Sequence, residues 1–337
     1  MMKRVISFAN PPSVVGYSSV VGKREHDGPI GEDFDIHDRC EKFGMNTWEK
    51  AESEMQRLAV NLALAKSDGK PDDIDMTFAG DLQNQCVGSA FGAGGMGRGF
   101  FGLYGACSTF AEAIILASLS ICGGFADTCA AVASSHFCVA ERQYRYPLEY
   151  GGQRTPTSQR TVTGAGAMIL SSGKGNIKIT EVMAGRIVNK GIKDANNMGA
   201  AMAPAAVDTI KGYLTETGHK PDDFDLILTG DLGAVGHGAV LEYLGRDGID
   251  VSKNYSDCGL MIYSCGRQDM HAGGSGCGCS AATVCGHIMK RFEKGELSDI
   301  LYIATGALMS TSSVQQGLAI PGIAHLVRIR SEGKNGD

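Results

Sequence analysis

The spacing of apolar and polar residues predicts an α/β protein. From residue 48 to residue 62, apolar side chains recur at steps of three and four, which indicates one face of an amphipathic helix, and Thr47 is a candidate N-cap for it. Short apolar runs at 74–79, 128–133 and 226–229 are bounded by Asp and Gly, a pattern typical of strands that are buried on both faces. Helices that alternate with such strands indicate an α/β fold.

An internal repeat divides the chain. The segment KPDDIDMTFAGDL at 70–82 recurs as KPDDFDLILTGDL at 220–232, with identity at eight of thirteen positions. In both copies the same features follow in the same order: a Cys-Ser pair that opens an apolar helix, an Asp that precedes an apolar strand, and a final strand. We therefore expect two copies of one supersecondary unit, residues 1–175 and 176–337. The paired features are Cys107 and Cys279, Asp127 and Asp299, and the strands 164–171 and 322–329.

Composition excludes several classes of function. The chain has 337 residues, with 43 % hydrophobic and 20 % charged side chains, enough to bury a large core. A net charge of −6 without a local cluster of Lys and Arg argues against a nucleic-acid partner. The eleven cysteines are odd in number and lack paired CxxC spacing, so we expect reduced thiols, no metal site and no cofactor. The apolar stretch 113–126 is shorter than the roughly 20 residues of a membrane span, and no signal-peptide pattern is present, so neither a span nor export is expected.

Cys107 is the strongest candidate for chemistry. It follows a strand-like run and opens a helix, where unpaired backbone N–H groups and the helix dipole favour a thiolate. Two histidines are candidate bases: His136 at the carboxyl end of the strand 127–133, and His271 before a Gly-rich segment of the second copy. The alternatives stay open at this point, because a small buried thiol at a crowded helix start and hydrogen-bonded structural histidines account for the same pattern.

Two aspartates end buried strands at equivalent positions of the repeat. Asp81 and Asp231 both follow a glycine where the strand leaves the core. We expect Asp81 to approach the site, since Cys107 and His136 lie in the same half, and Asp231 to cap its own loop through backbone N–H groups. The run 92–97 matches GxGxxG, but no strand directly precedes it and no helix opens on it, so a flexible loop is a better interpretation than a phosphate cradle.

The duplicated unit, the Cys107 helix start and the Gly-rich segment 271–280 together resemble the thiolase superfamily, whose fold the β-ketoacyl synthases share. The resemblance spans nearly the whole chain and implies a thiolase-like duplicated αβαβα layered fold with two pseudo-two-fold related halves. It also implies an alternative function, an acyl-CoA condensing or thiolytic enzyme with Cys107 as nucleophile and His136 and His271 beside it. The enzymes of this fold need two polar groups from the second half, as in Cys-His-His or Cys-His-Asn. Here only His271 stands near such a place, so Claisen chemistry is not the favoured interpretation.

Longer composite motifs resemble a more specific family, that of stage V sporulation protein AD. The motifs are AGDLQNQ at 79–85, GACST at 105–109, SSH at 134–136, AERQYRYPLEYGGQ at 140–153, MAPAA at 202–206 and DCGLMIY at 257–263. This resemblance implies a non-enzymatic protein that binds dipicolinic acid, with or without its calcium, and serves dipicolinate uptake into the developing spore. It also implies membrane-embedded stage V sporulation A subunits as partners and a location at the cytoplasmic face, peripheral to the spore inner membrane. By analogy with thiolase-like relatives, we expect a homodimer.

A dipicolinate site must provide donors to two carboxylates, a flat slot for the pyridine ring and tolerance of a bound cation. Donors are available at the backbone of the Cys107 helix start, the Ser135 hydroxyl and His136, while Asp81 offers a ligand to calcium or an acceptor to a protonated ring nitrogen. We therefore expect a ligand pocket of Asp81, Cys107, Ser135 and His136. The segment 142–152 is basic and aromatic and is either a lid, a partner contact or a solvated loop. A structural subunit with a vestigial pocket is a third alternative.

Overall fold

The arrangement of helices and strands confirms the α/β class expected from the apolar pattern. The structure is a computed structural model that describes residues 3–94, 96, 99–144, 154–173 and 175–332. The expected amphipathic helix is α2 (Trp48–Lys66), and Oγ1 of Thr47 accepts a hydrogen bond from the Lys50 amide at 3.3 Å, as an N-cap does. Most of the segment 142–152, which is expected to be a lid, a partner contact or a solvated loop, lies outside the described residues. Part of the run 92–97, which is expected to be a flexible loop, also lies outside them.

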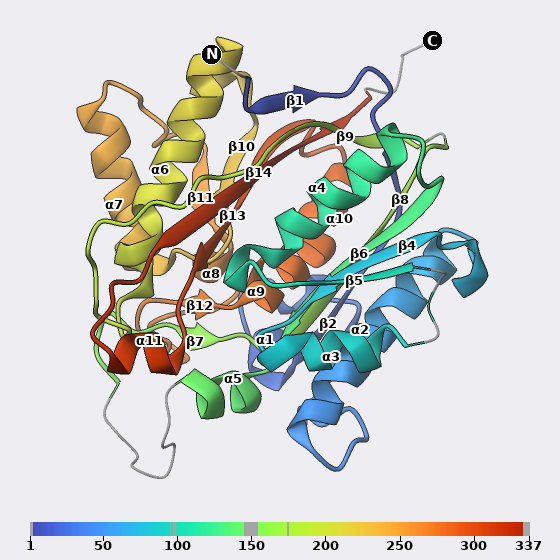
Figure 1. Ribbon diagram of the computed structural model, residues 1–337, viewed down its shortest axis with the longest axis horizontal. Helices are drawn as coiled ribbons and strands as arrows, with labels where there is room; N and C mark the ends of the chain where they lie inside the picture. Colours follow the sequence, from blue (N-terminus) through green and yellow to red (C-terminus); the bar gives the residue numbers. More distant parts are fainter. Residues whose placement is uncertain (1–2, 95, 97–98, 145–153, 174, 333–337) are drawn as a thin grey trace.

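A 12-stranded sheet runs through the described part of the molecule (Figure 1). The main strands of the first half are β2 (Ser13–Gly22), β4 (Met76–Gly80), β5 (Gly99–Leu103), β6 (Thr128–Ser135) and β8 (Gly164–Ser171). Those of the second half are β9 (Ile177–Met183), β10 (Leu226–Thr229), β11 (Tyr255–Asp257), β13 (Asp299–Ala307) and β14 (Gly322–Ser331). The smaller strands are β1 (Val5–Ser7) and β3 (Ile36–Asp38), with β7 (Arg160–Thr161) and β12 (Gly274–Ser275) paired apart from the large sheet.

The two halves repeat one strand topology. From its outer edge inward, the first half runs β5-β4-β6-β8-β2 and the second runs β11-β10-β13-β14-β9. In each half the first three strands are parallel, and the last two pair antiparallel to their neighbours. The halves join where Ser13 of β2 pairs with Lys178 of β9. The expected boundary after residue 175 falls between β8 and β9.

The repeated KPDD segments form the same local structure in both halves. Each makes one turn of 3₁₀ helix, Pro71–Asp73 and Pro221–Asp223, directly before the buried strand. Asp73 accepts a hydrogen bond from the Lys70 amide at 2.7 Å, and Asp223 accepts one from the Lys220 amide at 2.8 Å. The carboxylate satisfies a backbone donor at the start of the turn, which explains why the repeat retains this sequence.

Helices cover both outer faces and fill the space between the halves (Figure 1). The central helices are α4 (Thr109–Cys122), α9 (Cys277–Thr283) and α10 (Met289–Glu293), and α4 contacts strands of both halves. On the outer faces, α2 packs on the first half and α6 (Met198–Thr217) with α7 (Gly233–Arg246) on the second. Short helices complete the chain: α1 (Lys23–His26), α3 (Val87–Gly92), α5 (Phe137–Tyr144), α8 (Cys258–Met261) and α11 (Thr311–Gln315).

The buried side chains among the described residues form three clusters that match these layers. The central cluster includes Phe110 and Ile114 of α4 together with Tyr302 of β13, and the other two lie under α2 and under α6. Glycine lets the halves meet closely. A Cβ at Gly306 of β13 would lie 2.4 Å from the Gly105 carbonyl oxygen, so the turn before Cys107 rests directly on the second half.

Candidate functional site

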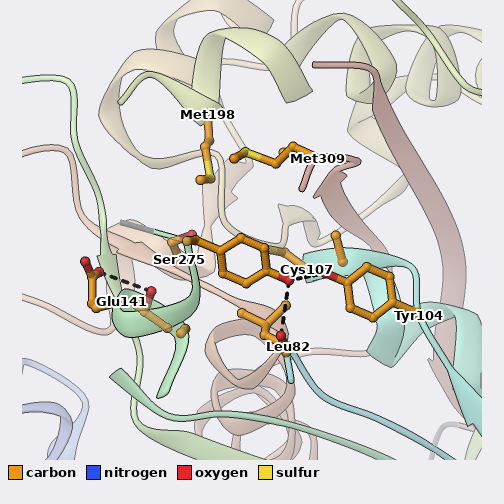
Figure 2. A pocket seen from close by; sticks show the side chains of 12 residues that line it. Leu82, Tyr104, Cys107, Glu141, Met198, Ser275 and Met309 are labelled. Atoms are coloured by element: carbon orange, nitrogen blue, oxygen red, sulfur yellow. Dashed lines mark hydrogen bonds between the residues drawn. The ribbon is translucent and has the colours of Figure 1, made fainter. Parts of the chain in front are cut away.

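A cavity lies beside Cys107, where the carboxyl ends of β4, β5 and β13 meet α5 and the start of α6 (Figure 2). Ligand sites of α/β folds are commonly found at this end of the strands. The empty space, including the open mouth, is about 470 Å³, of which about 40 Å³ admits the centre of a water molecule. We call it the Cys107 cavity. Its lining residues are Leu82, Tyr104, Ala106, Cys107, Ala140, Glu141, Tyr144, Thr161, Met198, Ser275, Ala307 and Met309.

A strained turn carries Cys107 into this cavity. Ala106 has a φ of 51°, a left-handed conformation that a residue with a Cβ rarely adopts. The turn is held from within, because the Thr109 hydroxyl donates to the Ala106 carbonyl at 2.7 Å and the Ser108 hydroxyl donates to the Gly105 carbonyl at 2.6 Å. Cys107 therefore lies in the single 3₁₀ turn that precedes α4, close to the helix start expected from the sequence. Such retained strain is characteristic of functional sites.

The Cys107 thiol faces a carboxylate of the second half. It lies beside Asp231, whose carboxylate accepts from the Gly276 amide at 2.9 Å, the Thr305 hydroxyl at 2.9 Å and the Ser275 hydroxyl at 3.3 Å. Burial, and then the negative charge of Asp231, raise the pKa of the Cys107 thiol well above its usual value. Burial likewise raises the pKa of Asp231 to about 7. These neighbours keep the thiol protonated, which is the opposite of what a helix start alone predicts.

Two tyrosines close one side of the cavity. The Tyr144 hydroxyl donates to the Leu82 carbonyl at 3.1 Å, and the Tyr104 hydroxyl is hydrogen-bonded to that of Tyr144 (Figure 2). The remaining polar groups are the Thr161 and Ser275 hydroxyls and the Glu141 carboxylate. Lys, Arg and His are absent from the lining residues of this described cavity.

Methionine side chains form the opposite wall. Met198 and Met309 lie across the cavity from Leu82 (Figure 2). Thioether side chains are flexible and polarizable and adapt to flat ring surfaces. The cavity therefore combines an apolar wall with hydroxyl donors, the composition expected of a small-molecule site.

Asp81 is not among the residues that line the cavity, and its expected role in the ligand pocket stays a prediction. Its carboxylate accepts from the Gln83 amide at 2.8 Å and from both the amide and the hydroxyl of Ser89 at 2.6 Å. Glu52 lies near it, and burial together with Asp81 raises the pKa of Glu52 to about 8. Asp81 is thus part of a buried hydrogen-bond network beneath α2 and α3.

Ser135 and His136 are also held outside the lining of the cavity. The Ser135 hydroxyl donates to the Val162 carbonyl at 2.7 Å and accepts from the Gly278 amide at 3.2 Å. Both ring nitrogens of His136 are engaged: Nε2 with the Glu41 carbonyl at 2.8 Å and Nδ1 with the Cys138 amide at 3.2 Å. Burial lowers the pKa of His136, so the ring is neutral at physiological pH. A ligand role for either residue stays a prediction.

His271 is also not among the residues that line the cavity. Its Nε2 lies 3.3 Å from Oδ1 of Asp269, in a turn where both residues have positive φ. The hydrogen bonds described for His136 and the ion pair of His271 are made with residues other than Cys107, and the pairing of this thiol with either base stays a prediction. Asp231, which the sequence predicts to cap its own loop, lies beside Cys107 instead. The sequence signal that could have indicated this role is its position in the repeat, which is equivalent to that of Asp81. Among the described residues, no group of three or more His, Cys, Asp or Glu side chains has the arrangement of a metal site.

Comparison with known proteins identifies the family of this chain. A family model described as Stage V sporulation protein AD (SpoVAD) matches residues 2–330. Stage V sporulation protein AD of Bacillus subtilis (strain 168) is 44 % identical over 331 residues, which cover 98 % of this chain and 98 % of that protein. The chain belongs to the stage V sporulation protein AD family. The resemblance carried by the composite motifs is confirmed, and the protein is a sporulation protein of this family.

Solved structures similar to this stage V sporulation protein AD family member confirm the thiolase-like fold. The 3-oxoacyl-[acyl-carrier-protein] synthase III of Aquifex aeolicus VF5 is 16 % identical, with a TM-score of 0.56 over 94 % of this chain and 99 % of that one. OleA of Xanthomonas campestris is 13 % identical, with a TM-score of 0.61 over 96 % of this chain and 99 % of that one. At this level of identity the similarity establishes the fold alone.

Proposed function

We propose that this protein binds dipicolinate as its calcium chelate in the Cys107 cavity and serves dipicolinate uptake into the developing spore, without catalysing a reaction on it. The observation that carries the proposal is the pairing of Cys107 with Asp231. A nucleophilic cysteine is commonly activated by a positive neighbour that favours the thiolate, whereas burial and the negative charge of Asp231 raise the pKa of this thiol, so its resting form is protonated. Membership of the sporulation family supports the ligand class.

The charges around the cavity favour the chelate over the free dianion. Asp231 lies behind Cys107, while no cationic side chain is among the lining residues described. A free dianion would be desolvated next to this carboxylate without a positive partner from that lining, which is unfavourable. A calcium chelate of a dicarboxylate has no net charge, and its calcium needs no cluster of protein carboxylates. The Thr161 hydroxyl donates to Glu141 at 3.5 Å and the Ser275 hydroxyl donates to Asp231 at 3.3 Å, so their oxygen atoms face the cavity as ligands to the calcium of the chelate.

We propose further that the protein acts at the cytoplasmic face of the spore inner membrane, docked on membrane-embedded stage V sporulation A subunits. No helix in the described part of the chain has the length and apolarity needed to cross a bilayer. A binding component of that kind depends on embedded partners for passage of the ligand across the membrane. Its family membership supports this assignment.

Calorimetry tests the proposal. Calcium dipicolinate is titrated into the wild-type protein and into Ala140→Phe, which fills the cavity from α5, with Ala65→Phe on the exposed side of α2 as the matched control. We expect wild-type and control to bind alike, Ala140→Phe to bind at least about tenfold more weakly because its ring occupies the ligand volume, and dipicolinate with a calcium chelator to bind more weakly than the chelate. Equal binding by Ala140→Phe contradicts the location, and absence of binding by the wild type contradicts the function.

The alternative is an acyl-CoA condensing or thiolytic enzyme with Cys107 as nucleophile. The observation in its favour is that Cys107 reaches the cavity from a strained turn at the start of α4. Incubation with acetyl-CoA followed by intact-protein mass spectrometry separates the two functions. The binding proposal predicts no acyl adduct on the wild type and retained dipicolinate binding by Cys107→Ser. An adduct on the wild type that is lost in Cys107→Ser favours the enzyme.

A further inference from the structure

Tyr104 and Tyr144 stand between the Cys107 cavity and the outside. Two depressions on the surface adjoin the cavity, and Tyr144 and Met309 line all three spaces. Tyr104 lines the inner cavity and the first depression, and its side chain is 43 % exposed. A ligand that enters from these depressions therefore meets the hydroxyl pair before it reaches Cys107. The first depression, which we call the vestibule, is also lined by Asn84, Gln85, Gln143, Ser310 and Thr311.

The inner cavity is too small for a pyridine dicarboxylate with its calcium while the tyrosine pair stays closed. The space that admits water centres is about 40 Å³, room for two or three water molecules, whereas the same measure of the vestibule is about 470 Å³. Movement of the Tyr144 side chain joins the two spaces, because that side chain belongs to the walls of both. Its closed position depends on the hydrogen bond to the Leu82 carbonyl and on the hydrogen bond with Tyr104.

The hydrogen bonds of the pair can be exchanged without loss. The Leu82 carbonyl accepts a second hydrogen bond, from Nε2 of Gln143 at 3.0 Å, so it keeps a partner when Tyr144 leaves. In the closed state Tyr144 donates to Leu82, which leaves its oxygen to accept from Tyr104. Desolvation raises the pKa of Tyr104 to about 12 and that of Tyr144 further, so both hydroxyls keep their protons. Two phenol donors thus become available together to one acceptor with two oxygen atoms.

Two strained turns lie beside this pair, whose Tyr144 is carried by α5. Gln85 and Cys86 have φ values of 60° and 54°, and Ala106, two residues after Tyr104, has a φ of 51°. The Cys86 thiol donates to the Leu103 carbonyl at 3.0 Å, which ties the vestibule turn to the end of β5 directly before Tyr104. Side chains with a Cβ are held in this conformation only where surrounding structure requires it, and such positions cluster at ligand sites.

We propose that Tyr104 and Tyr144 are the specificity-determining residues of the site, and that their two hydroxyls bind one carboxylate of a planar aromatic dicarboxylate and so select diacids over monoacids. The inference rests on the proposed function. The first carboxylate of the ligand and its calcium enter the inner cavity beside Thr161 and Ser275, and the second stays at the tyrosine pair. A monoacid has no carboxylate at that position. When it binds, both phenol hydroxyls give up the hydrogen bonds of the closed pair and gain none from the ligand.

Matched titrations test the inference. The calcium forms of pyridine-2,6-dicarboxylate and pyridine-2-carboxylate are titrated into the wild type, Tyr104→Phe, Tyr144→Phe and the double variant, with Tyr243→Phe on the exposed surface of α7 as control. We expect each cavity substitution to weaken diacid binding by roughly ten- to hundredfold, since each removes a hydrogen bond to a charged group, and to change monoacid binding little. The diacid preference of the double variant should then be largely lost, while the control keeps it.

The outcomes separate this inference from the function on which it rests. If the wild type binds the diacid and the double variant keeps the full preference for diacid over monoacid, the role of the tyrosines is wrong and the proposed function stands. If the double variant loses affinity for both ligands equally, the pair supports the cavity but does not select, which also overturns the inference. If the wild type binds neither ligand, both proposals fail. The substitutions remove only a hydroxyl, and circular dichroism of each variant verifies that the fold is kept.

Discussion

The contact between Cys107 and Asp231 gives a sharp prediction for thiol reactivity. Substitution Asp231→Asn keeps the shape of the side chain and removes its negative charge. The amide oxygen can still accept from the Gly276 amide, which donates to Asp231 at 2.9 Å. The thiolate of Cys107 then no longer forms beside a carboxylate. We expect alkylation of Cys107 to become faster, because the thiolate is the reactive form.

The magnitude follows from the contact between the two groups. Two unit charges about 4 Å apart at an effective dielectric constant of about 20 interact by about 4 kcal/mol, a factor of roughly 1,000 in thiolate fraction. Burial raises the pKa of Asp231 to about 7, so near neutral pH about half of the molecules already lack this charge. We therefore expect an increase of at least about tenfold at pH 8, where Asp231 is mostly ionised.

Iodoacetamide labelling measures this effect. Peptide mass spectrometry follows the modification of Cys107 over time, with the exposed Cys40 as the internal reference for reagent strength. Asp81→Asn is the matched control, since Asp81 occupies the equivalent position of the repeat but bonds to Gln83 and Ser89. Labelling of Cys107 that is unchanged or slower in Asp231→Asn, with Cys40 unchanged, would refute the reasoning that the carboxylate holds the thiol protonated.

Two further predictions concern stability and assembly. Glu52 is fully buried and has a pKa raised to about 8, so its contribution to stability is present below the ordinary pKa of about 4.5 and is lost as the pH rises through about 8. Urea unfolding at pH 5 and at pH 9 measures this effect. Between these pH values the free energy of unfolding of Glu52→Gln should rise by about 3 kcal/mol relative to that of the wild type, which is less than the full pKa difference gives because Asp81 competes for the proton. Glu54→Gln on the same helix should show no such trend, and a difference for Glu52→Gln that does not change with pH would contradict the assignment. The expected homodimer can form through β5, because this strand is an edge of the described sheet and its Phe101 is 50 % exposed. Light scattering should therefore find a dimer that Phe101→Glu converts to a monomer, while Phe125→Glu, at a 77 % exposed site, leaves the dimer intact. A monomeric wild type at tens of micromolar would contradict this prediction.

The fold followed from the sequence because its signals are local and repeated. The helical spacing after Thr47 and the apolar run at 226–229 each reflect burial within one half, and α2 and β10 form where these patterns predict them. The duplicated KPDD segments fixed the correspondence of the halves, since an identical turn precedes β4 and β10. The pairing of β2 with β9 could not be predicted from the sequence. Only one residue pair, Ser13 with Lys178, is in register between these described strands, and a single pair leaves no pattern along the chain.

The site was only partly predictable, because it forms between the halves. Cys107 was found from its place before a helix. The sequence pattern offers Asp81 and His136 of the first half and His271 of the second half as its candidate partners. The packing of the two halves instead brings the equivalent aspartate, Asp231, against the thiol, together with the amide of Gly276. Sequence order cannot show which copy of a repeated carboxylate faces the other half.

Tyr104 and Tyr144 illustrate the same limit for the cavity wall. Tyr144 lies on α5 within the motif at 140–153 that resembles the sporulation family, and Tyr104 directly precedes the motif at 105–109. Their spacing gives no periodic signal, and their function depends on a hydroxyl pair formed across 40 positions of the chain. Contacts of this kind are determined by the way α5 folds over the ends of β4 and β5.

A crystal structure of the protein with calcium dipicolinate tests the central claim most directly. The account predicts ligand and calcium density between Cys107, Met309 and the tyrosine pair, with Tyr144 turned away from the Leu82 carbonyl. Density for the compound at a different surface, with the cavity closed as before, would contradict it.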